Sequence, residues 1–349
     1  MEEWTIFYVG SDTSEIGDEY PEELMHVMQA LKERLAPVWL PEALKNLAKI
    51  EKEGWRTRRG PDPPYNVQPF KTSLKPGARP VRCGNRKYTH VERGYLEEFV
   101  GLLEQYGFVL ENVNSEWASP VLVVKRPNGQ GFRMVVDYRE LNKLCEGVAF
   151  PMPDLDALVN ELAESKYFFS LDAFKGFWYM PLHEEDMEMF SFKTHKGVYT
   201  PTRSMQGALN SATLYQARLH SLYKEYLWKN LIIWIDDLLG HAKTLEEWFT
   251  VLEQVLLIAE KVGLVFSITK CDLLLKEVKW CGKIFSEHGV KHDPERIRSL
   301  VELPSPCDAQ QLQQFIYATQ WMARTIPQYV GKMLPLTDLY ESIMAEQPK

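Results

Sequence analysis

Two adjacent carboxylates, Asp236 and Asp237, lie within the otherwise mostly apolar residues 231–241, LIIWIDDLLGH. The β-branched and aromatic residues there predict a strand, a turn and a second strand, with both aspartates at the turn. Aspartate is common in turns because its side chain hydrogen-bonds to nearby backbone, so an isolated pair is typical of a solvated turn. Two like charges at the tip of a buried hairpin instead favour a counter-ion, and Mg²⁺ commonly binds carboxylate oxygens.

A third carboxylate, Asp172, follows the apolar residues 167–171, which predict a strand. One interpretation makes Asp172 the N-cap of a helix that starts at Ala173. The alternative is a metal ligand on a strand that lies beside the hairpin. Three acids on neighbouring strands can hold two divalent ions about 3.5–4 Å apart, an arrangement that stabilises the attacking and leaving oxygens in phosphoryl transfer.

The elements that must position these acids are helices alternating with antiparallel hairpins. Capping boxes at Thr89 and Thr244 begin two of the helices, which we expect to end near Gly107 and Gly263. The other predicted helices are 151–165, 210–227 and those that start at Asp293 and Asp308. The predicted strands are 119–126 with 132–139, a hairpin within 190–204, 265–268 and 279–285. Regular βαβ units do not occur, so the pattern predicts the α+β class.

The composition is that of a globular protein, with 45% apolar and 12% aromatic residues among 349. Apolar runs stay shorter than the roughly 18 residues that a membrane span needs, so we expect no membrane partner. The N-terminus is acidic and lacks a basic leader, and we therefore do not expect secretion. Five widely spaced cysteines without a Cys-x-x-Cys pair argue against zinc and for a reducing compartment.

The net charge of −8 is concentrated at one end of the chain. Residues 1–31 hold eight acids and no Lys or Arg, so the rest of the chain is neutral overall. Residues 71–91 hold six bases and no acid. This basic arm (residues 71–91) either pairs with nucleic-acid phosphates or is an ordinary solvated loop, and the sequence favours neither interpretation.

Seven motifs stand in order along the chain. They are SEWASPVLVVKRPNGQGFRMVVDYRELNK (115–143), FFSLDAFKGFWYMPL (168–182), SMQGALNSATLYQARL (204–219), IIWIDDLLG (232–240), GLVFSITKC (263–271), VKWCGKIF (278–285) and LPSPCDAQQLQQFIYATQWMARTIPQYVGKMLPLTDL (303–339). In this order and spacing, from about Pro64 to Leu339, the chain resembles the polymerase region of a reverse transcriptase from a gypsy-type LTR retrotransposon.

The resemblance implies an α+β right-hand polymerase with fingers, palm and thumb. The expected parts are an acidic N-terminal segment with helices (1–60), the connection and fingers (61–135), the palm (136–285, with a fingers part inserted at about 183–205) and the thumb (286–349). The implied activity is that of an RNA-directed DNA polymerase, a nucleotidyltransferase that adds deoxynucleotides to a primer 3′-hydroxyl. Its partners would be dNTPs and an RNA or DNA template-primer, and its oligomeric state is not predicted.

The resemblance also implies a setting for the chain. It would be part of a larger polyprotein or derived from one, and it would act in the cytoplasm, in virus-like particles, with the nucleus as a second location. The sequence holds no DTG or DSG protease motif and no further acidic constellation. We therefore expect no protease, RNase H or integrase activity from this chain itself.

Roles for single residues follow from the same resemblance. Asp172, Asp236 and Asp237 would hold two Mg²⁺ ions, or Mn²⁺ in their place, with the carbonyl of Ala173 as a further ligand. Lys270 would be the acid for the pyrophosphate leaving group, although a solvated lysine is the alternative. The other expected site residues are Arg126 and Arg133 on the β- and γ-phosphates, Lys175 and Gly176 by their backbone N–H groups, Phe177 closing the sugar pocket, Gln206 and Gly207 under the incoming nucleotide, and Trp280, Cys281 and Gly282 as the primer grip.

Phe177 keeps core packing as an alternative interpretation, because its neighbours are also apolar. Two positions depart from the family pattern: Trp234 stands where Tyr is usual before x-Asp-Asp, and Met205 where Pro is usual before Gln-Gly. Neither departure removes a catalytic group. A second hypothesis is a degenerate or host-adopted copy that binds nucleic acid without polymerising, and a third gives the acidic N-terminal segment a protein-binding role.

Overall fold

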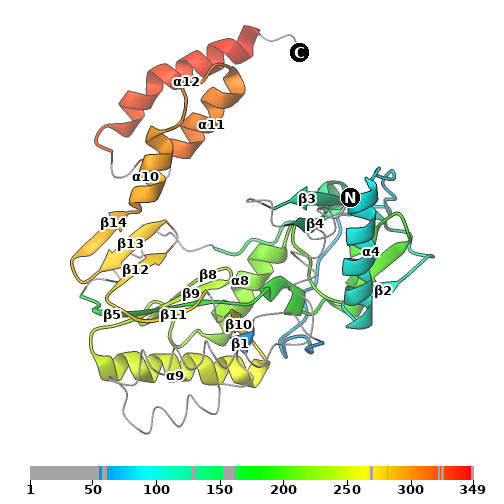
Figure 1. The fold of residues 1–349 in the computed structure, drawn as a ribbon, viewed down its shortest axis with the longest axis horizontal. Coiled ribbons are helices and arrows are strands. Elements are labelled where there is room, and N and C mark those ends of the chain that lie inside the picture. The colour runs from blue at the N-terminus through cyan, green and yellow to red at the C-terminus, as the bar shows by residue number, and fades with distance from the viewer. Residues whose placement is uncertain are drawn as a thin grey trace, which may run out of the picture. The chain divides into compact units, whose positions relative to one another are not determined.

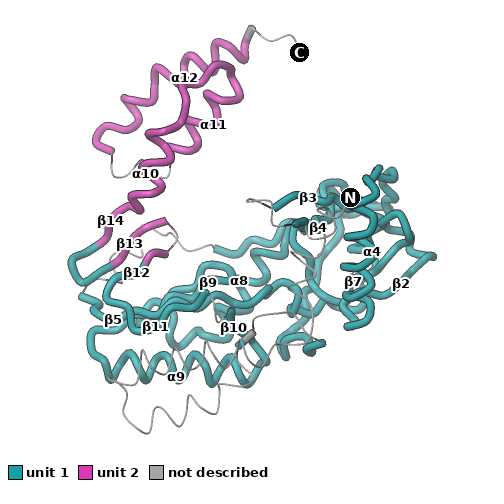
Figure 2. Tube along the Cα trace, viewed as in Figure 1, with its two compact units in different colours: residues 1–278, 286–289 teal, residues 279–285, 290–349 magenta. Residues whose placement is uncertain are grey.

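The computed structural model describes residues 55–56, 61–126, 131–151, 162, 164–267, 270–280, 282–320, 323 and 326–346. Two compact units divide the chain, one formed by residues 1–278 with 286–289 and the other by residues 279–285 with 290–349 (Figure 2). The expected division into fingers, palm and thumb stays a prediction, and most of the acidic N-terminal segment lies outside the described residues. Within the described residues, no helix combines the length and apolarity needed to cross a membrane.

A four-stranded antiparallel sheet forms the centre of the first unit (Figure 1). Its strands, in spatial order, are β11 (Asp272–Leu275), β5 (Tyr167–Asp172), β9 (Asp237–Ala242) and β8 (Leu231–Trp234). Helix α9 (Leu245–Val262) covers one face, where Trp248 packs edge-on against Phe169 with ring centroids 6.0 Å apart. A Cβ at Gly240 would lie within the ring of Phe169, so this close packing needs a glycine on β9.

A second, five-stranded sheet belongs to the same unit. Its order is β2 (Val109–Glu111), β7 (Val198–Pro201), β6 (Phe192–Lys193), β3 (Ser119–Lys125) and β4 (Phe132–Val136). Strands β3 and β4 pair antiparallel from Val121 opposite Val136 to Lys125 opposite Phe132, as predicted. The residues of the predicted Asn-Gly turn, 127–130, lie outside the described residues. A short parallel pair, β1 (Trp55–Arg56) with β10 (Phe266–Ser267), completes the sheets of this unit that the structure describes.

Two helices of the first unit begin at the polar caps that the sequence predicts. Helix α4 (His90–Gln105) has the full capping box between Thr89 and Glu92, and α9 has Thr244 at its N-cap and Gly263, with φ of +74°, at its C-cap. The remaining helical segments in the described part of this unit are α5 (Arg139–Leu144), η2 (Gly176–Tyr179), α7 (Glu184–Met187), η3 (Glu188–Phe190) and α8 (Ser211–Leu222). The helix predicted at 151–165 falls mostly on residues that are not described.

The second unit contains most of a three-stranded sheet and three helices. The elements are β12 (Glu277–Trp280), β13 (Lys283–Ser286), β14 (Gly289–His292), α10 (Pro294–Val301), α11 (Ala309–Gln320) and α12 (Tyr329–Glu346). Asp293 caps α10 by accepting from the N–H of Glu295, as predicted, and its carboxylate also pairs with Lys279 at 2.7 Å.

Several predicted boundaries are wrong. The hairpin turn consists of Ile235 and Asp236, because Trp234 pairs with Asp237 and Asp237 is already the first residue of β9. Asp172 ends β5 and does not cap an α-helix. The helix predicted to run to residue 227 ends at Leu222, and residues 279–285 form parts of two strands because Gly282, with φ of +77°, turns the chain between them.

Candidate active site

A pocket of about 230 Å³ opens at the end of β5, beside the β8–β9 turn. Its lining includes most of the residues predicted from the sequence: Asp172, Ala173, Asp236 and Lys270, together with Arg133, Lys175, Gly176, Phe177 and Gln206. Met134, Val135, Val136, Trp178 and Met205 complete the wall. Asp237, Arg126 and Gly207 do not line this pocket.

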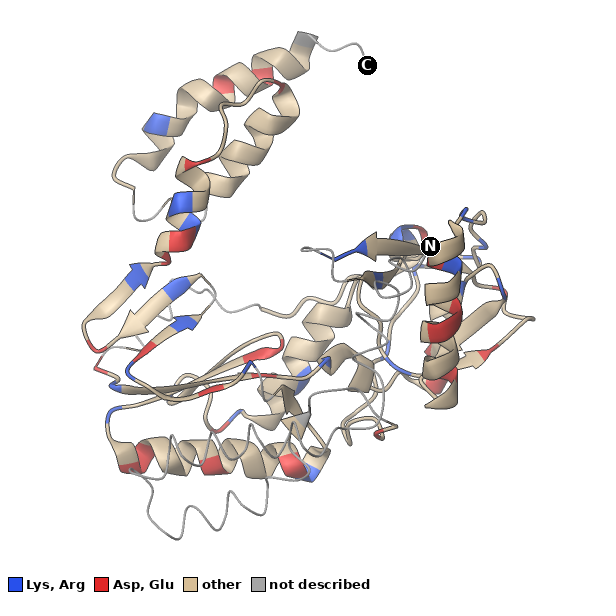
Figure 3. Ribbon diagram, viewed as in Figure 1, with Lys and Arg blue, Asp and Glu red and all other residues tan. Residues whose placement is uncertain are grey.

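The pairing of β5 with β9 brings the acids together. Asp172 lies directly opposite Asp237 in the register, and opposed residues of an antiparallel pair have Cβ atoms about 4.5–5.5 Å apart. Asp236 is held to the same end of the sheet because its carbonyl accepts a 2.8 Å hydrogen bond from the N–H of Ala173. Figure 3 shows acidic residues at this end of the β8–β9 hairpin. The hydrophobic pattern thus fixes a register that ends in carboxylates on both strands.

Burial and mutual repulsion disfavour negative charge at this turn. Burial raises the pKa of Asp236, and the nearby Asp172 carboxylate raises it further. Burial likewise raises the pKa of Asp237 to about 6, with added repulsion from Asp236 and Asp172. When these side chains are ionised near pH 7, a cation bound between them would offset the burial and repulsion of their charges.

Lys270 supplies one positive charge at this site. Its Nζ lies 3.3 Å and 3.2 Å from the two carboxylate oxygens of Asp172, while its own side chain is 65% exposed. Cys271, which follows Lys270 in the chain, accepts a hydrogen bond through its sulfur from the backbone N–H of Asp172 at 3.3 Å. Among the described residues, no three His, Cys, Asp or Glu side chains are gathered closely enough to enclose a metal ion.

The wall that follows Asp172 turns sharply. Lys175 has a left-handed backbone with φ of +48°, and η2 begins at Gly176. A Cβ on Gly176 would lie 2.1 Å from the hydroxyl of Tyr215, a fully buried residue of α8, so only glycine fits there. Phe177 packs on the same tyrosine with ring centroids 5.0 Å apart, and it also lines the pocket. The two interpretations of Phe177, pocket and core, therefore both describe its position.

Gln206 also lines the pocket, and the loop that follows it is held by α5. The side chain of Asn142, on α5, donates to the carbonyl of Gly207 at 3.0 Å and accepts from the N–H of Leu209 at 2.9 Å. Gly207 itself has φ of +97°, a conformation that favours glycine. Asn142 thus fastens this loop to α5.

Arg133 and Arg126 differ in position. Arg133 lies on β4 opposite Val124 and lines the pocket, and its predicted role at the phosphates stays a prediction. Arg126 follows β3, where its backbone N–H donates to the carbonyl of Gly131 at 2.9 Å and closes the hairpin. Of the two arginines expected to bind phosphate, Arg133 therefore lines the pocket and Arg126 does not.

The predicted primer-grip residues belong to the second unit. Trp280, on β12, is buried and packs near Phe285 with ring centroids 6.3 Å apart. A Cβ at Gly282 would lie 2.3 Å from the guanidinium of Arg296. Cys281 lies outside the described residues. The role of all three at a primer stays a prediction.

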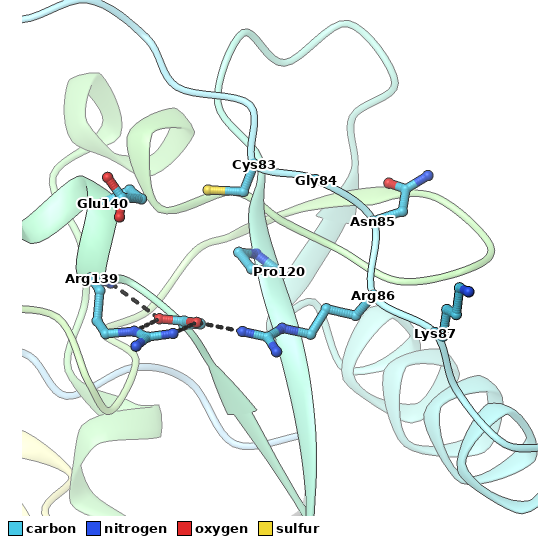
Figure 4. Close-up of a pocket in the computed structure, with 9 residues that line it drawn as sticks. Cys83, Gly84, Asn85, Arg86, Lys87, Pro120, Arg139 and Glu140 are labelled. Carbon is cyan, nitrogen blue, oxygen red and sulfur yellow. Dashed lines mark hydrogen bonds and ion pairs between the residues drawn. The ribbon is translucent and has the colours of Figure 1, made fainter.

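The basic arm is attached to the first unit by its own cations. Arg86 and Arg139, whose side chains Figure 4 shows, both pair with the Asp137 carboxylate in the lining of a second pocket of about 460 Å³. Asp137 accepts from Arg139 at 2.8 and 2.7 Å and from Arg86 at 2.8 Å, and hydrogen bonding by Arg139 is the largest of the effects that hold the pKa of this carboxyl far below its usual range. Arg82 donates to the carbonyl of Ser115 at 2.7 Å. Part of the arm's charge is therefore used within the protein.

Sequence analysis missed the residues that support the pocket from behind. Asn142, Tyr215 and Gln216 fall inside the quoted motifs, but none was assigned a role. One signal was available in the sequence: Gln216 is a polar residue between the apolar Leu214 and Leu219 of a predicted helix. If such an amide is buried, it needs specific hydrogen-bond partners.

Residues 124–285 match the protein family described as "Reverse transcriptase (RNA-dependent DNA polymerase)". The chain is 28% identical over 293 residues to the Pol polyprotein from transposon opus of Drosophila melanogaster, covering 81% of this chain and 29% of that protein. It is 25% identical over 236 residues to the Pol polyprotein from transposon gypsy of the same organism, covering 66% of this chain and 23% of that protein. The chain thus spans less than a third of the length of these two relatives.

Among solved structures, a foamy viral protease-reverse transcriptase in complex with double-stranded DNA is similar, with a TM-score of 0.77 and 23% identity over 94% of this chain and 57% of that one. This likeness shows the right-hand polymerase fold. The family match shows that residues 124–285 form a reverse transcriptase domain, and the transposon relatives confirm the resemblance to the gypsy-type group.

Proposed function

We propose that this reverse transcriptase domain is an RNA-directed DNA polymerase, which adds deoxynucleotides to a primer 3′-hydroxyl on an RNA or DNA template. The observation that carries the proposal is one pocket lined by Asp172, Asp236 and the guanidinium of Arg133. Asp237 lies opposite Asp172 on the neighbouring strand. Carboxylates and a phosphate-binding cation around one cavity suit phosphoryl transfer.

The charge and burial of the carboxylates favour a divalent cation, although no three acids of the described residues are gathered around one point. Asp236 and Asp237 are partly buried like charges with raised pKa values, which a bound cation would relieve. We propose that these two residues and Asp172 hold two Mg²⁺ ions, or Mn²⁺ in their place, with the carbonyl of Ala173 as a further ligand. When bound, the ions would acidify the primer hydroxyl and neutralise the triphosphate. The remaining ligands would come from substrate phosphates and water, as is usual for Mg²⁺.

The chain's own residues would bind and orient the nucleotide. Arg133 would bind the β- and γ-phosphates bidentately, and Arg126 would join it when the hairpin approaches the triphosphate. The backbone N–H groups of Lys175 and Gly176 would meet the phosphates, at a turn that packs against Tyr215 because Gly176 has no side chain. Lys270, which already lies in the pocket beside Asp172, is the proposed acid for the pyrophosphate leaving group.

The sugar and base would lie between the two walls of the pocket. Phe177 is held by Tyr215, so its ring would exclude a 2′-hydroxyl by a clash that cannot relax easily. Gln206 and Gly207 would support the incoming nucleotide, because the Asn142 side chain fixes their loop. Trp280, Cys281 and Gly282 remain the proposed primer grip.

The proposed macromolecular partner is a double-stranded template-primer. Similar solved structures are described in complex with double-stranded DNA and with an RNA/DNA hybrid. The relatives are polyproteins, and we propose that this chain likewise functions as part of one or derives from one.

Primer extension by the purified chain tests the proposal. A labelled primer on RNA or DNA template is incubated with dNTPs and Mg²⁺, beside Asp172→Asn and the control Asp338→Asn, which changes an exposed acid on α12. We expect extension by the unmodified chain and the control, none by Asp172→Asn, and duplex binding by all three. Duplex binding without extension by the unmodified chain, with either Mg²⁺ or Mn²⁺, would instead support the non-polymerising copy.

A further inference from the structure

Gln216 is a fully buried residue of α8 whose side chain lies against the turn that carries Asp236. Its Nε2 donates to the carbonyl of Ile233 at 2.8 Å, and its Oε1 accepts from the backbone N–H of Ile235 at 2.5 Å. Nε2 also lies 2.7 Å from Nε2 of His220, one helical turn later. The amide therefore has partners on both sides of the last residue of β8.

The bonds fix the orientation of this amide. The carbonyl of Ile233 can only accept and the N–H of Ile235 can only donate, so exchanging the oxygen and nitrogen of Gln216 would break both contacts. Because the side chain is completely shielded from water, no solvent molecule offers a replacement partner of equal strength. The geometry is thus specific to an amide at this position.

The turn that Gln216 contacts is conformationally unfavourable. Ile235 has φ of +55°, a region that β-branched residues rarely adopt, and two-residue hairpin loops with positive φ usually contain Gly, Asn or Asp. Such a conformation persists only where surrounding contacts hold it. The bond from the N–H of Ile235 to Gln216 is a contact of this kind, and the next residue along the chain is Asp236.

We propose that Gln216 is a positioning residue for Asp236: it holds the strained turn so that this carboxylate stays in the pocket. The inference rests on the proposed polymerase function. A group displaced by about 1 Å can lower a rate by roughly a hundredfold. Loss of the amide should therefore lower the rate of nucleotide addition and weaken the metal response, and leave duplex binding nearly unchanged.

Gln216→Met tests this, because methionine keeps the volume and removes both hydrogen bonds. Tyr223→Phe is the matched control: its buried hydroxyl donates to the carbonyl of Val255 at 3.2 Å, at the end of the same helix and away from the turn. The second test is Ile235→Gly in the Gln216→Met background, since glycine adopts positive φ without the support of the amide.

Four quantities are measured for each variant: single-turnover rate, the Mg²⁺ concentration for half-maximal rate, template-primer Kd, and the rise in melting temperature on adding Mg²⁺. We expect Gln216→Met to lose at least about tenfold in rate, to need more Mg²⁺ and to show a smaller melting shift, with Kd within about twofold. Tyr223→Phe should keep all four values. The double variant should regain part of the rate and of the melting shift.

The results separate two failures. If the unmodified chain extends primers and Gln216→Met does so at the same rate with the same Mg²⁺ response, Gln216 only fills the core and the inference is wrong. A double variant that is slower still than Gln216→Met would also refute it, because relief of strain would then give no benefit. If the unmodified chain does not extend primers at all, the proposed function fails; an unchanged melting shift in Gln216→Met would then reject the positioning role independently.

Discussion

The carboxylate of Asp237 is partly buried on β9 beside Asp236 and Asp172, and Asp237→Asn tests what this arrangement does to stability. Burial and repulsion raise its folded-state pKa to about 6, from 3.8 for an ordinary aspartate. Between these two values the folded chain binds more protons than the unfolded chain does. The contribution of Asp237 to stability is therefore fully present below about pH 4, decreases as the pH rises through 6, and stays lost above that pH.

The size of the effect follows from the shift. About two pKa units correspond to roughly 3 kcal/mol, and screening of this partly exposed side chain reduces that to about 1–2 kcal/mol. Asparagine has no charge to bury, so the variant should recover this free energy of unfolding above pH 7. For a unit of this size, about 1 kcal/mol moves the melting temperature by roughly 2–4 °C.

The assay is a set of thermal melts in EDTA at pH 5 and pH 8, repeated with Mg²⁺. We expect Asp237→Asn to melt a few degrees above the unmodified chain at pH 8, with a smaller difference at pH 5, and Mg²⁺ to raise the unmodified chain more than the variant. Asp186→Ala is the control, because this buried acid accepts from the N–H of Thr72 at 2.8 Å and alanine offers no acceptor, so this variant should be less stable. A lower melting temperature for Asp237→Asn at pH 8 without metal would refute the reasoning, since protein contacts would then hold the charge.

Three further predictions concern single side chains. Phe177→Val should raise ribonucleotide incorporation strongly relative to deoxynucleotide incorporation; single-nucleotide kinetics with matched dNTP and rNTP check this, and an unchanged ratio would leave Phe177 with a packing role alone. Gly176→Ala should lower the free energy of unfolding by about 1–3 kcal/mol and raise the KM for dNTP, because the alanine Cβ would lie 2.1 Å from the hydroxyl of Tyr215. A denaturation curve measures the first effect and steady-state kinetics the second. Burial lowers the pKa of His241 to about 4, so the unfolded chain takes up the proton first as the pH falls below about 6.5, and the contribution of His241 to the free energy of unfolding falls by up to about 3 kcal/mol between pH 6.5 and 4. His241→Gln lacks this loss, so urea titrations of both chains should show the unmodified chain losing stability relative to the variant over this range.

The strands that carry the aspartates could be predicted because their signals are local. Residues 167–171 and 238–239 are apolar, and each run borders an aspartate, while the register that places Asp172 opposite Asp237 comes from the structure. The helix ends at Thr89 and Thr244 were likewise encoded by polar caps that need no distant partner. These elements follow from patterns within a few residues.

The turn at Ile235 could not be predicted in the same way. Local preferences would place Asp236 and Asp237 in the loop and keep Ile235 in the strand. The structure places Ile235 in the loop with positive φ, held by an amide from a residue 19 positions earlier in the chain. Turn position here depends on a tertiary contact, and a sequence pattern does not report such a contact.

Two adjacent residues of α8, Tyr215 and Gln216, support two different parts of the pocket lining. Lys175 and Ile235, neither of them glycine, have positive φ, and each lies beside a residue with a proposed role: Gly176 follows the first and Asp236 follows the second. Tyr215 fits against Gly176 and Phe177, while Gln216 bonds to the turn before Asp236. Successive side chains on an α-helix point about 100° apart, because there are 3.6 residues in each turn, so two adjacent residues can reach two different walls. Helix α8 therefore supports both the Gly176–Phe177 turn and the turn before Asp236, and a change at Tyr215 or Gln216 should alter one of these turns without directly breaking the contacts of the other.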